Sequence, residues 1–254
     1  MPGALEVLVT RLRAAGCVFA EDEAALLIAA ATGSELDALV ARRASGEPLE
    51  HLLGWAEFCG LRVVVAPGVF VPRRRTELMV TEAVALVTPA AVVVELCCGS
   101  GAVAAALVAQ AGPLDLHAVD VDPAAVRCAR RNLPTANVIQ GDLYDALPTR
   151  LCGHVDLLLV NAPYVPTAAL ATMPPEARLH EARVALDGGP DGLDVQRRVA
   201  ADARGWLATG GSLLVETSAQ QAPATAELLA AGGLVPRIVT AVELDATVVV
   251  ASRI

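Results

Sequence analysis

The spacing of hydrophobic and polar positions changes once along the chain, near residue 89. Before that point, apolar side chains at helical spacing predict helices over residues 4–15 and 21–32. A third, short helix is expected to start at Ser34 or Asp37 and to end near Arg43. A glycine-punctuated, β-rich run that ends near residue 68 then predicts a hairpin. An amphipathic helix opens at Thr76 and Glu77. The first third of the chain is therefore expected to be a small helical module joined to the rest by a hairpin.

After residue 89, apolar runs of strand length alternate with helical segments. Strands are expected over residues 91–96, 114–119, 136–140, 155–160 and 212–216, helices over 102–110, 123–132, 192–208 and 222–231, and a closing pair of strands over 235–243 and 246–252. This alternation predicts an α/β fold with an open, mostly parallel sheet covered on both faces. Ligands of such sheets bind at the carboxyl ends of the strands.

Composition and charge narrow the classes of protein. Apolar residues make up 55% of the 254 residues and aromatic residues only 3%, so the core must consist of Ala, Val and Leu. The net charge of −9 disfavours a surface that follows a nucleic-acid backbone, although Arg73–Arg75 form a local basic patch. Six cysteines without metal-ligand spacing indicate reduced thiols and no metal site. Neither an export signal nor a membrane-length apolar run is visible, which predicts a cytoplasmic protein.

Candidate chemistry lies at the predicted strand ends. The turn Glu95–Gly101 is rich in glycine, which permits close approach of a ligand. Asp120 follows Gly99 by roughly the 20 residues typical of an acid that binds ribose hydroxyls. After the third strand, Asp142 can accept from an adenine amino group and Leu143 can pack on the ring. Together these features predict a cofactor that contains adenosine.

The run Asn161-Ala162-Pro163-Tyr164 ends the fourth strand. A side-chain carbonyl, a backbone carbonyl before a rigid proline and an aromatic face could together hold a planar NH2 group. This run has no role in hydride transfer, and Cys97 interrupts the glycine pattern of a nicotinamide site. S-adenosylmethionine is therefore favoured over a nicotinamide cofactor.

These segments resemble the HemK/PrmC family, protein-glutamine N-methyltransferases that modify release factors. The similarity covers residues 46–54, 58–61, 67–73, 76–77, 95–101, 161–164, 183–189 and 191–193, in the family's order. It implies a Rossmann-like class I methyltransferase sheet. It also implies an N-terminal helical substrate-recognition domain (1–58), a hairpin connector (59–76) and a methyltransferase domain (77–254).

The resemblance further implies a role for each matching residue. S-adenosyl-L-methionine is the expected methyl donor and S-adenosyl-L-homocysteine the product. The cofactor would contact Glu95, Cys97, Cys98, Gly99, Ser100, Gly101, Asp120, Asp142, Leu143 and Asn161. Catalysis and substrate binding would fall to Asn161, Ala162, Pro163 and Tyr164, with Phe70 walling the pocket. The expected partner is a protein with an exposed glutamine, such as a peptide chain release factor. Binding to a membrane or directly to nucleic acid is not expected.

Three departures from the family pattern stand at these positions. Ala162 replaces the first proline of Asn-Pro-Pro-Tyr, and Cys97 replaces a usual glycine, which makes the sign of its φ angle a question. Arg74 and Arg75 replace a usual proline and acid and would change the charge of the rim where a substrate docks. Together with the short N-terminal module, these departures suggest a paralogue whose target need not be a release factor.

Three alternatives remain open at the level of sequence. An adenine amino-methyltransferase of DNA or RNA uses a similar acceptor site, but the net charge and the connector disfavour it. Methylation of a small-molecule amine is a second alternative. A cofactor-binding partner protein without turnover is the third, and the intact acceptor run argues against it.

Overall fold

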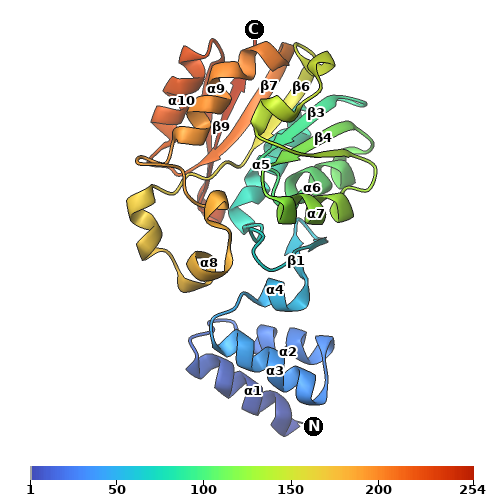
Figure 1. Cartoon of the computed structure of the whole chain (residues 1–254), viewed down its shortest axis with the longest axis vertical. Helices are drawn as coiled ribbons and strands as arrows, with labels where there is room; N and C mark the ends of the chain where they lie inside the picture. The colour runs from blue at the N-terminus through green and yellow to red at the C-terminus, as the bar shows by residue number, and fades with distance from the viewer. Residues whose placement is uncertain (1) are drawn as a thin grey trace.

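The computed structural model describes residues 2–254, with side chains from residue 5 onward, and divides into a helical end and a sheet end (Figure 1). Helices α1 (Pro2–Ala14), α2 (Ala20–Ala30) and α3 (Gly33–Ala44) pack around the fully buried Leu12, Leu27 and Val40. A short helix that the sequence did not predict, α4 (Leu49–Leu53), follows and ends at Gly54, whose φ is +79°. The helical module thus has a small core of its own.

A two-stranded hairpin connects the module to the sheet. Strands β1 (Trp55–Phe58) and β2 (Leu61–Val64) pair antiparallel, and the two turn residues, Cys59 and Gly60, both have positive φ, as tight hairpin turns require. The hairpin therefore begins inside the range that sequence assigned to the helical domain. The Asn132 side chain bonds the backbone of Val64 (2.8 and 2.9 Å) and the carbonyl of Ser100 (2.8 Å). This residue ties the connector to the glycine-rich turn of the sheet.

The sheet has seven strands in the order β5-β4-β3-β6-β7-β9-β8. The first five are parallel, and β9 pairs antiparallel with both β7 and β8. The strands are β3 (Val92–Leu96), β4 (Asp115–Asp120), β5 (Asn137–Gln140), β6 (Val155–Val160), β7 (Leu207–Thr217), β8 (Val235–Ala241) and β9 (Ala246–Ser252). The predicted α/β class and the mostly parallel sheet are confirmed.

Helices cover both faces of the sheet (Figure 1). They are α5 (Glu77–Leu86), α6 (Ala102–Ala111), α7 (Pro123–Asn132), α9 (Asp194–Trp206) and α10 (Ala222–Ala231). The helix predicted over 192–208 is too long at both ends, because Leu207 already belongs to β7, where it pairs with Val155. An apolar run that passes from helix into strand leaves this boundary unmarked in the sequence.

The core is split into two layers by the alternation of side chains along each strand. Val93 and Leu157 belong to the layer under α5 and α6, whereas Val94 and Leu158 belong to the layer under α9 and α10. All four are at most 1% exposed, and burial of each such side chain stabilises the fold by about 1.5–3 kcal/mol. The two layers fix the strands rigidly, so the strand ends form a firm base for a site.

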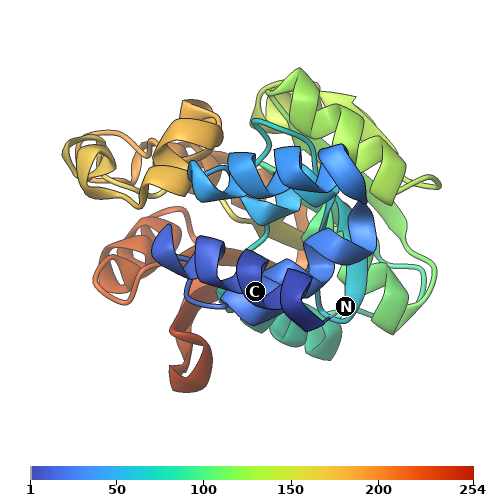
Figure 2. The same cartoon turned by 90° about the horizontal axis from the view of Figure 1, so that it is seen from below.

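Between β6 and α9 the chain makes a long excursion, residues 165–187, which the sequence left unassigned. It contains the 3-10 turns Thr167–Thr172 and Arg183–Ala185 and the helix α8 (Pro175–His180). Glu181 pairs with Arg73 of the connector (2.6 Å), and Glu176 pairs with the buried Arg43 of α3. Seen from below, this gold segment lies beside the blue helices of the module (Figure 2). Among the described residues, no helix has the length and apolar character needed to cross a membrane.

Candidate active site

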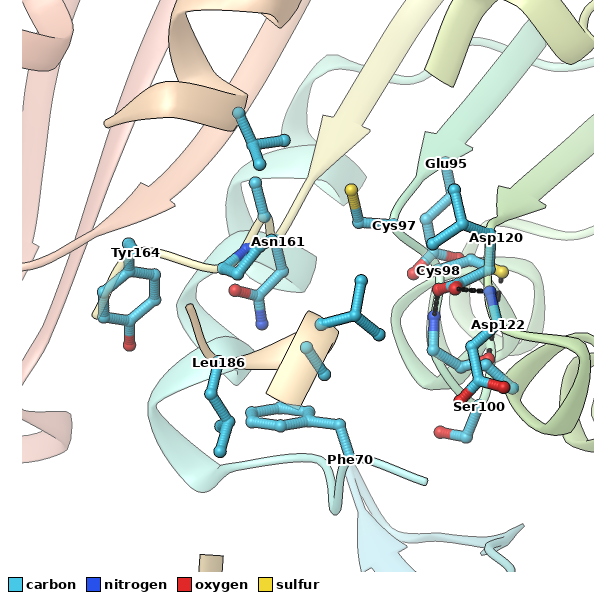
Figure 3. Close-up of a pocket in the computed structure, with 18 of the residues that line it drawn as sticks. Phe70, Glu95, Cys97, Cys98, Ser100, Asp120, Asp122, Asn161, Tyr164 and Leu186 are labelled. Atoms are coloured by element: carbon cyan, nitrogen blue, oxygen red, sulfur yellow. Dashed lines mark hydrogen bonds between the residues drawn. The ribbon is translucent and has the colours of Figure 1, made fainter. Parts of the chain in front are cut away.

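The carboxyl ends of β5, β4, β3 and β6 meet at one cavity of about 410 Å³. The chain order reverses between β3 and β6, which is the switch point where open α/β sheets bind ligands. Every residue that the sequence placed in the site lines this cavity except Gly101. Figure 3 shows the two ends of the pocket. One end holds Glu95, Cys97, Cys98 and Asp120 and is called the cofactor side, and the other holds Phe70, Asn161, Tyr164 and Leu186 and is called the acceptor end, after the roles that the sequence predicts.

The turn after β3 is held in an unusual backbone conformation. The φ angles of Cys97, Gly99 and Gly101 are +54°, +53° and +74°. A side chain at positive φ costs on the order of 1 kcal/mol, so Cys97 is strained where the family usually has glycine. Burial raises the pKa of the Cys97 thiol, and the charges of Asp120 and Asp142 raise it further, so the group stays neutral. Gly101 does not line the cavity, but a Cβ there would stand 2.8 Å from Leu133.

The buried carboxyl group of Glu95 and the half-buried one of Asp120 stabilise this turn. Oε2 of Glu95 accepts from the Ala104 amide (3.1 Å), and burial together with Asp120 raises the Glu95 pKa to about 8 against that hydrogen bond. Asp120 accepts from the amides of Gly99 (2.8 Å) and Asp122 (2.9 Å), yet burial still raises its pKa. Each of these accepting carboxyl oxygens keeps a second lone pair that can accept a hydrogen bond from a ligand.

The far end of the cofactor side lies beyond β5. Leu143 is 6% exposed and has a φ of +46°, so it is held against the cavity wall. Asp142 forms an exposed ion pair with Arg198 of α9 (2.8 Å), a cavity residue that the sequence did not indicate. Several carboxyl groups, a glycine-rich turn and an apolar wall fit a cofactor with positive charges, ribose hydroxyls and an adenine ring.

The acceptor end is built on Asn161, directly after β6. Its Nδ2 donates to the hydroxyl of the buried Thr76 (3.4 Å), an orientation that leaves Oδ1 free to accept. The Tyr164 hydroxyl donates to Oε1 of Glu216 (3.4 Å), the second-to-last residue of the neighbouring strand β7. Burial and the Glu216 charge raise the Tyr164 pKa to about 12, so the phenol stays protonated.

Glu216 and Thr76 support this end of the site, and sequence reasoning missed both roles. Glu216 is only 2% exposed, and its Oε2 has no hydrogen-bond partner within the described part of the chain. Burial raises its pKa, although Thr76, Arg75, Tyr164 and Arg73 oppose the shift. One signal was available, because Glu216 nearly ends an apolar strand just as Glu95 nearly ends another.

The backbone of the acceptor run is braced by the loop before α9. A Cβ at Gly188 would stand 2.7 Å from the Pro163 carbonyl, and one at Gly192 would stand 2.3 Å from the Tyr164 carbonyl. The Tyr164 carbonyl also accepts from Nε2 of Gln221 (2.9 Å). The glycines of this loop thus permit a backbone contact that holds the acceptor run in place.

Comparison with known proteins gives a consistent family. The model of the methyltransferase small domain matches residues 60–191. The chain is 39% identical to a release factor glutamine methyltransferase of Mycolicibacterium smegmatis, over 84% of this chain and 83% of the relative. The chain belongs to the release factor glutamine methyltransferase family. A member from Geobacter sulfurreducens is 42% identical, over 72% of this chain but only 65% of its own length.

Two further comparisons define the breadth of the family and the fold. A 4-amino-L-phenylalanine/4-methylamino-L-phenylalanine methyltransferase of Streptomyces pristinaespiralis is 38% identical, over 76% of this chain and 69% of that protein. A methyltransferase structure from Pyrococcus furiosus superposes with a TM-score of 0.56 at 16% identity, covering 83% of this chain and 95% of that one. The second comparison supports the class I methyltransferase fold alone.

The rim of the acceptor end carries three consecutive arginines, Arg73, Arg74 and Arg75. The Arg73 guanidinium lies over the Phe70 ring (4.7 Å from the ring centroid) and pairs with Glu181. Arg75 lines the cavity, whereas Arg74 does not. The two arginines that replace the family's proline and acid therefore have different surroundings.

Proposed function

We propose that this protein methylates the side-chain amide nitrogen of a glutamine in a protein, with a peptide chain release factor as the expected substrate. The observation that carries the proposal is the position of Asn161 at the end of β6, with Nδ2 bonded to Thr76 and Oδ1 free. The family's relatives named for release factor glutamine methylation support it. The predicted cytoplasmic location and lack of nucleic-acid binding stay predictions.

S-adenosyl-L-methionine supplies an electrophilic methyl group when it is bound, and S-adenosyl-L-homocysteine is the expected product. Cys97 to Ser100 would surround its methionine end beside Glu95, whereas Gly101, which does not line the cavity, would shape the turn. Asp120 would bind the ribose, and Asp142 and Leu143 would border the adenine. The carboxyl groups of this wall are well placed to offset a positively charged ligand, because none of them except Asp142 has a cationic partner within the described residues.

A carboxamide nitrogen is a poor nucleophile because its lone pair is delocalised. We infer that Oδ1 of Asn161 and the carbonyl of Ala162 each accept one N–H of the substrate amide and so fix its orientation. Pro163 restrains residue 162 to extended angles, so alanine can replace the family's proline there. Tyr164 and Phe70 would enclose the amide from the sides.

The acids that line the cavity, Glu95, Asp120, Asp122 and Asp142, all lie on the cofactor side. No His or acid of the described chain lines the acceptor end, so this end offers no lining general base. Orientation of the two reacting groups is the main contribution, and it can lower a barrier by about 7–11 kcal/mol. Carbonyl oxygens also stabilise the positive charge that develops on the nitrogen, which loses one proton to solvent after the methyl transfer.

A small amine is the second candidate substrate. The family relative that acts on an aromatic amino acid is 38% identical, close to the values for the release factor enzymes. The acceptor end does not distinguish an amide NH2 from an amine NH2 by any group that the structure describes. Substrate choice must then depend on the rim.

The test is transfer of a labelled methyl group to release factor, a glutamine peptide, an aromatic amine and DNA, followed by mass spectrometry of each product. We expect label on the glutamine side chain, and its loss in Asn161→Ala with the affinity for S-adenosylmethionine retained. Label on DNA alone, or tight cofactor binding with no labelled product, would refute the proposal. Label on the amine alone would favour the second candidate.

A further inference from the structure

The charged groups that line the cavity are separated by sign. All four lining acids stand on the cofactor side, and Arg198 there is paired with Asp142. The lining residues of the acceptor end include two cations, Arg73 and Arg75, and no acid. In a chain of net charge −9, this positive end is a local exception.

The two cations differ in what already neutralises them. Arg73 pairs with Glu181 at 2.6 Å and lies over the Phe70 ring, so its charge is engaged within the protein. Arg75 is exposed, lines the cavity and forms no ion pair with any acid in residues 5–254. Arg75 is therefore a cation on the pocket wall that is available to a ligand.

Two buried acids lie near this rim, and neither forms an ion pair with Arg75: Glu181 pairs with Arg73. Glu216 is 2% exposed and receives the Tyr164 hydroxyl, and no ion pair joins it to Arg75. Arg75 directly precedes Thr76, whose hydroxyl accepts from Nδ2 of Asn161 (3.4 Å), so its backbone lies at the acceptor end. In agreement with this position, the Arg75 charge opposes the rise in the pKa of both Glu216 and Tyr164.

We infer that Arg75 selects a substrate that carries a carboxylate group beside the methyl-accepting nitrogen. The inference rests on the proposed function and narrows its substrate class. A guanidinium presents paired N–H donors that match the two oxygens of a carboxylate. The carboxylate can come from an acidic side chain next to the glutamine in a protein, or from the α-carboxylate of a free amino acid that bears an amine. An acid at position 75 would instead repel the same group.

Two matched substrate pairs test this inference. The first pair is a glutamine peptide with either Glu or Met beside the glutamine that is methylated, because Met is similar in length and offers neither a carboxylate nor a second amide. The second is 4-aminophenylalanine with a free carboxylate or as its amide. For each substrate, kcat/KM is measured by labelled-methyl transfer, and Kd is measured separately by competition with a fluorescent peptide. The separate Kd reports on recognition even where turnover is slow.

We expect the carboxylate member of at least one pair to be preferred by about three- to ten-fold, the range of a partly exposed ion pair. The preference should shrink as salt is raised. Arg75→Glu should abolish or reverse it. Arg74→Glu is the matched control, because it makes the same charge change one residue away, outside the cavity, and should retain the preference.

Each outcome separates this inference from the proposed function. Methylation of both peptides without any preference in rate or Kd would overturn the inference and leave the function standing. A preference that survives in Arg75→Glu would show that another group recognises the carboxylate, which also overturns it. Methylation of the free amino acid but of neither peptide would refute the glutamine substrate. In that case, a preference for the free carboxylate over the amide that is lost in Arg75→Glu would support Arg75 as the selector, and equal use of the two would overturn the inference. If no substrate is methylated, the function fails, and equal Kd values within each pair would then overturn the inference as well.

Discussion

The buried carboxyl group of Glu95 should make the free protein less stable as pH rises. Its pKa is raised from an ordinary value of 4.5 to about 8, mainly by burial. Between these values the folded state binds more protons than the unfolded state, so the free energy of unfolding falls with increasing pH. From pH 5 to pH 8 the loss is about 3 kcal/mol, at about 1.4 kcal/mol for each unit of pKa difference. A Glu95→Gln variant cannot ionise and should not show this loss.

Urea unfolding of wild type and Glu95→Gln at intervals from pH 5 to pH 8 measures the effect. Carboxyl groups that do not interact with Glu95 titrate equally in both proteins, and Asp120 is the smallest of the three causes of the Glu95 shift. The difference between the two curves therefore reports mainly on Glu95. Near pH 5 that difference reports the packing cost of the substitution, because glutamine can still accept from the Ala104 amide. Toward pH 8 the free energy of unfolding of the variant should rise relative to that of the wild type by about 3 kcal/mol. A difference that stays constant across the range would refute the reasoning.

Three further predictions concern the two ends of the site. Asn161→Ala should lower kcat by about 100-fold or more, because the variant loses an oriented hydrogen-bond acceptor, while the Kd of S-adenosylmethionine should change little. Methyl-transfer assays measure kcat, and calorimetry measures the Kd. Cys97→Gly should stabilise the protein by up to about 1 kcal/mol in urea unfolding, because glycine relieves the positive φ, and a destabilised variant would show that the thiol packs favourably. Gly192→Ala should lower the free energy of unfolding by about 2 kcal/mol or more and reduce turnover, because its Cβ would meet the Tyr164 carbonyl. A fully active, stable variant would show that this close backbone contact does not hold the acceptor run in place.

The strands and the site positions that end them were readable from sequence because they depend on local pattern. The apolar runs over 91–96 and 155–160 correspond to β3 and β6 to within one residue at either end. Since parallel strands place their carboxyl ends on one edge, Cys97, Asp120, Asp142 and Asn161 could be expected at a common cavity, and they line one. Strand order was not needed for that step.

The supporting residues could not be read because their roles depend on contacts between distant segments. Thr76 meets Asn161 across 85 positions, and Gln221 meets Tyr164 across 57. Glu216 shows only as a polar residue at the end of an apolar strand. The excursion over 165–187 has little periodicity, and its placement depends on Arg73 and Arg43 elsewhere in the chain. Contacts of this kind leave no local signal.

The departures from the family pattern do not fall equally on the two ends of the cavity. On the cofactor side only Cys97 differs, at a cost in backbone strain, and the carboxyl groups that would face the cofactor are present. On the acceptor side, Ala162, Arg74 and Arg75 all differ. Two relatives of similar identity are named as methyltransferases of different substrates, one of a release factor and one of an amino acid. Because the methyl donor is common to the family, the acceptor rim is where the choice of substrate can change while the methyl-transfer chemistry is kept. The charge at position 75 is then the smallest change that could redirect this site.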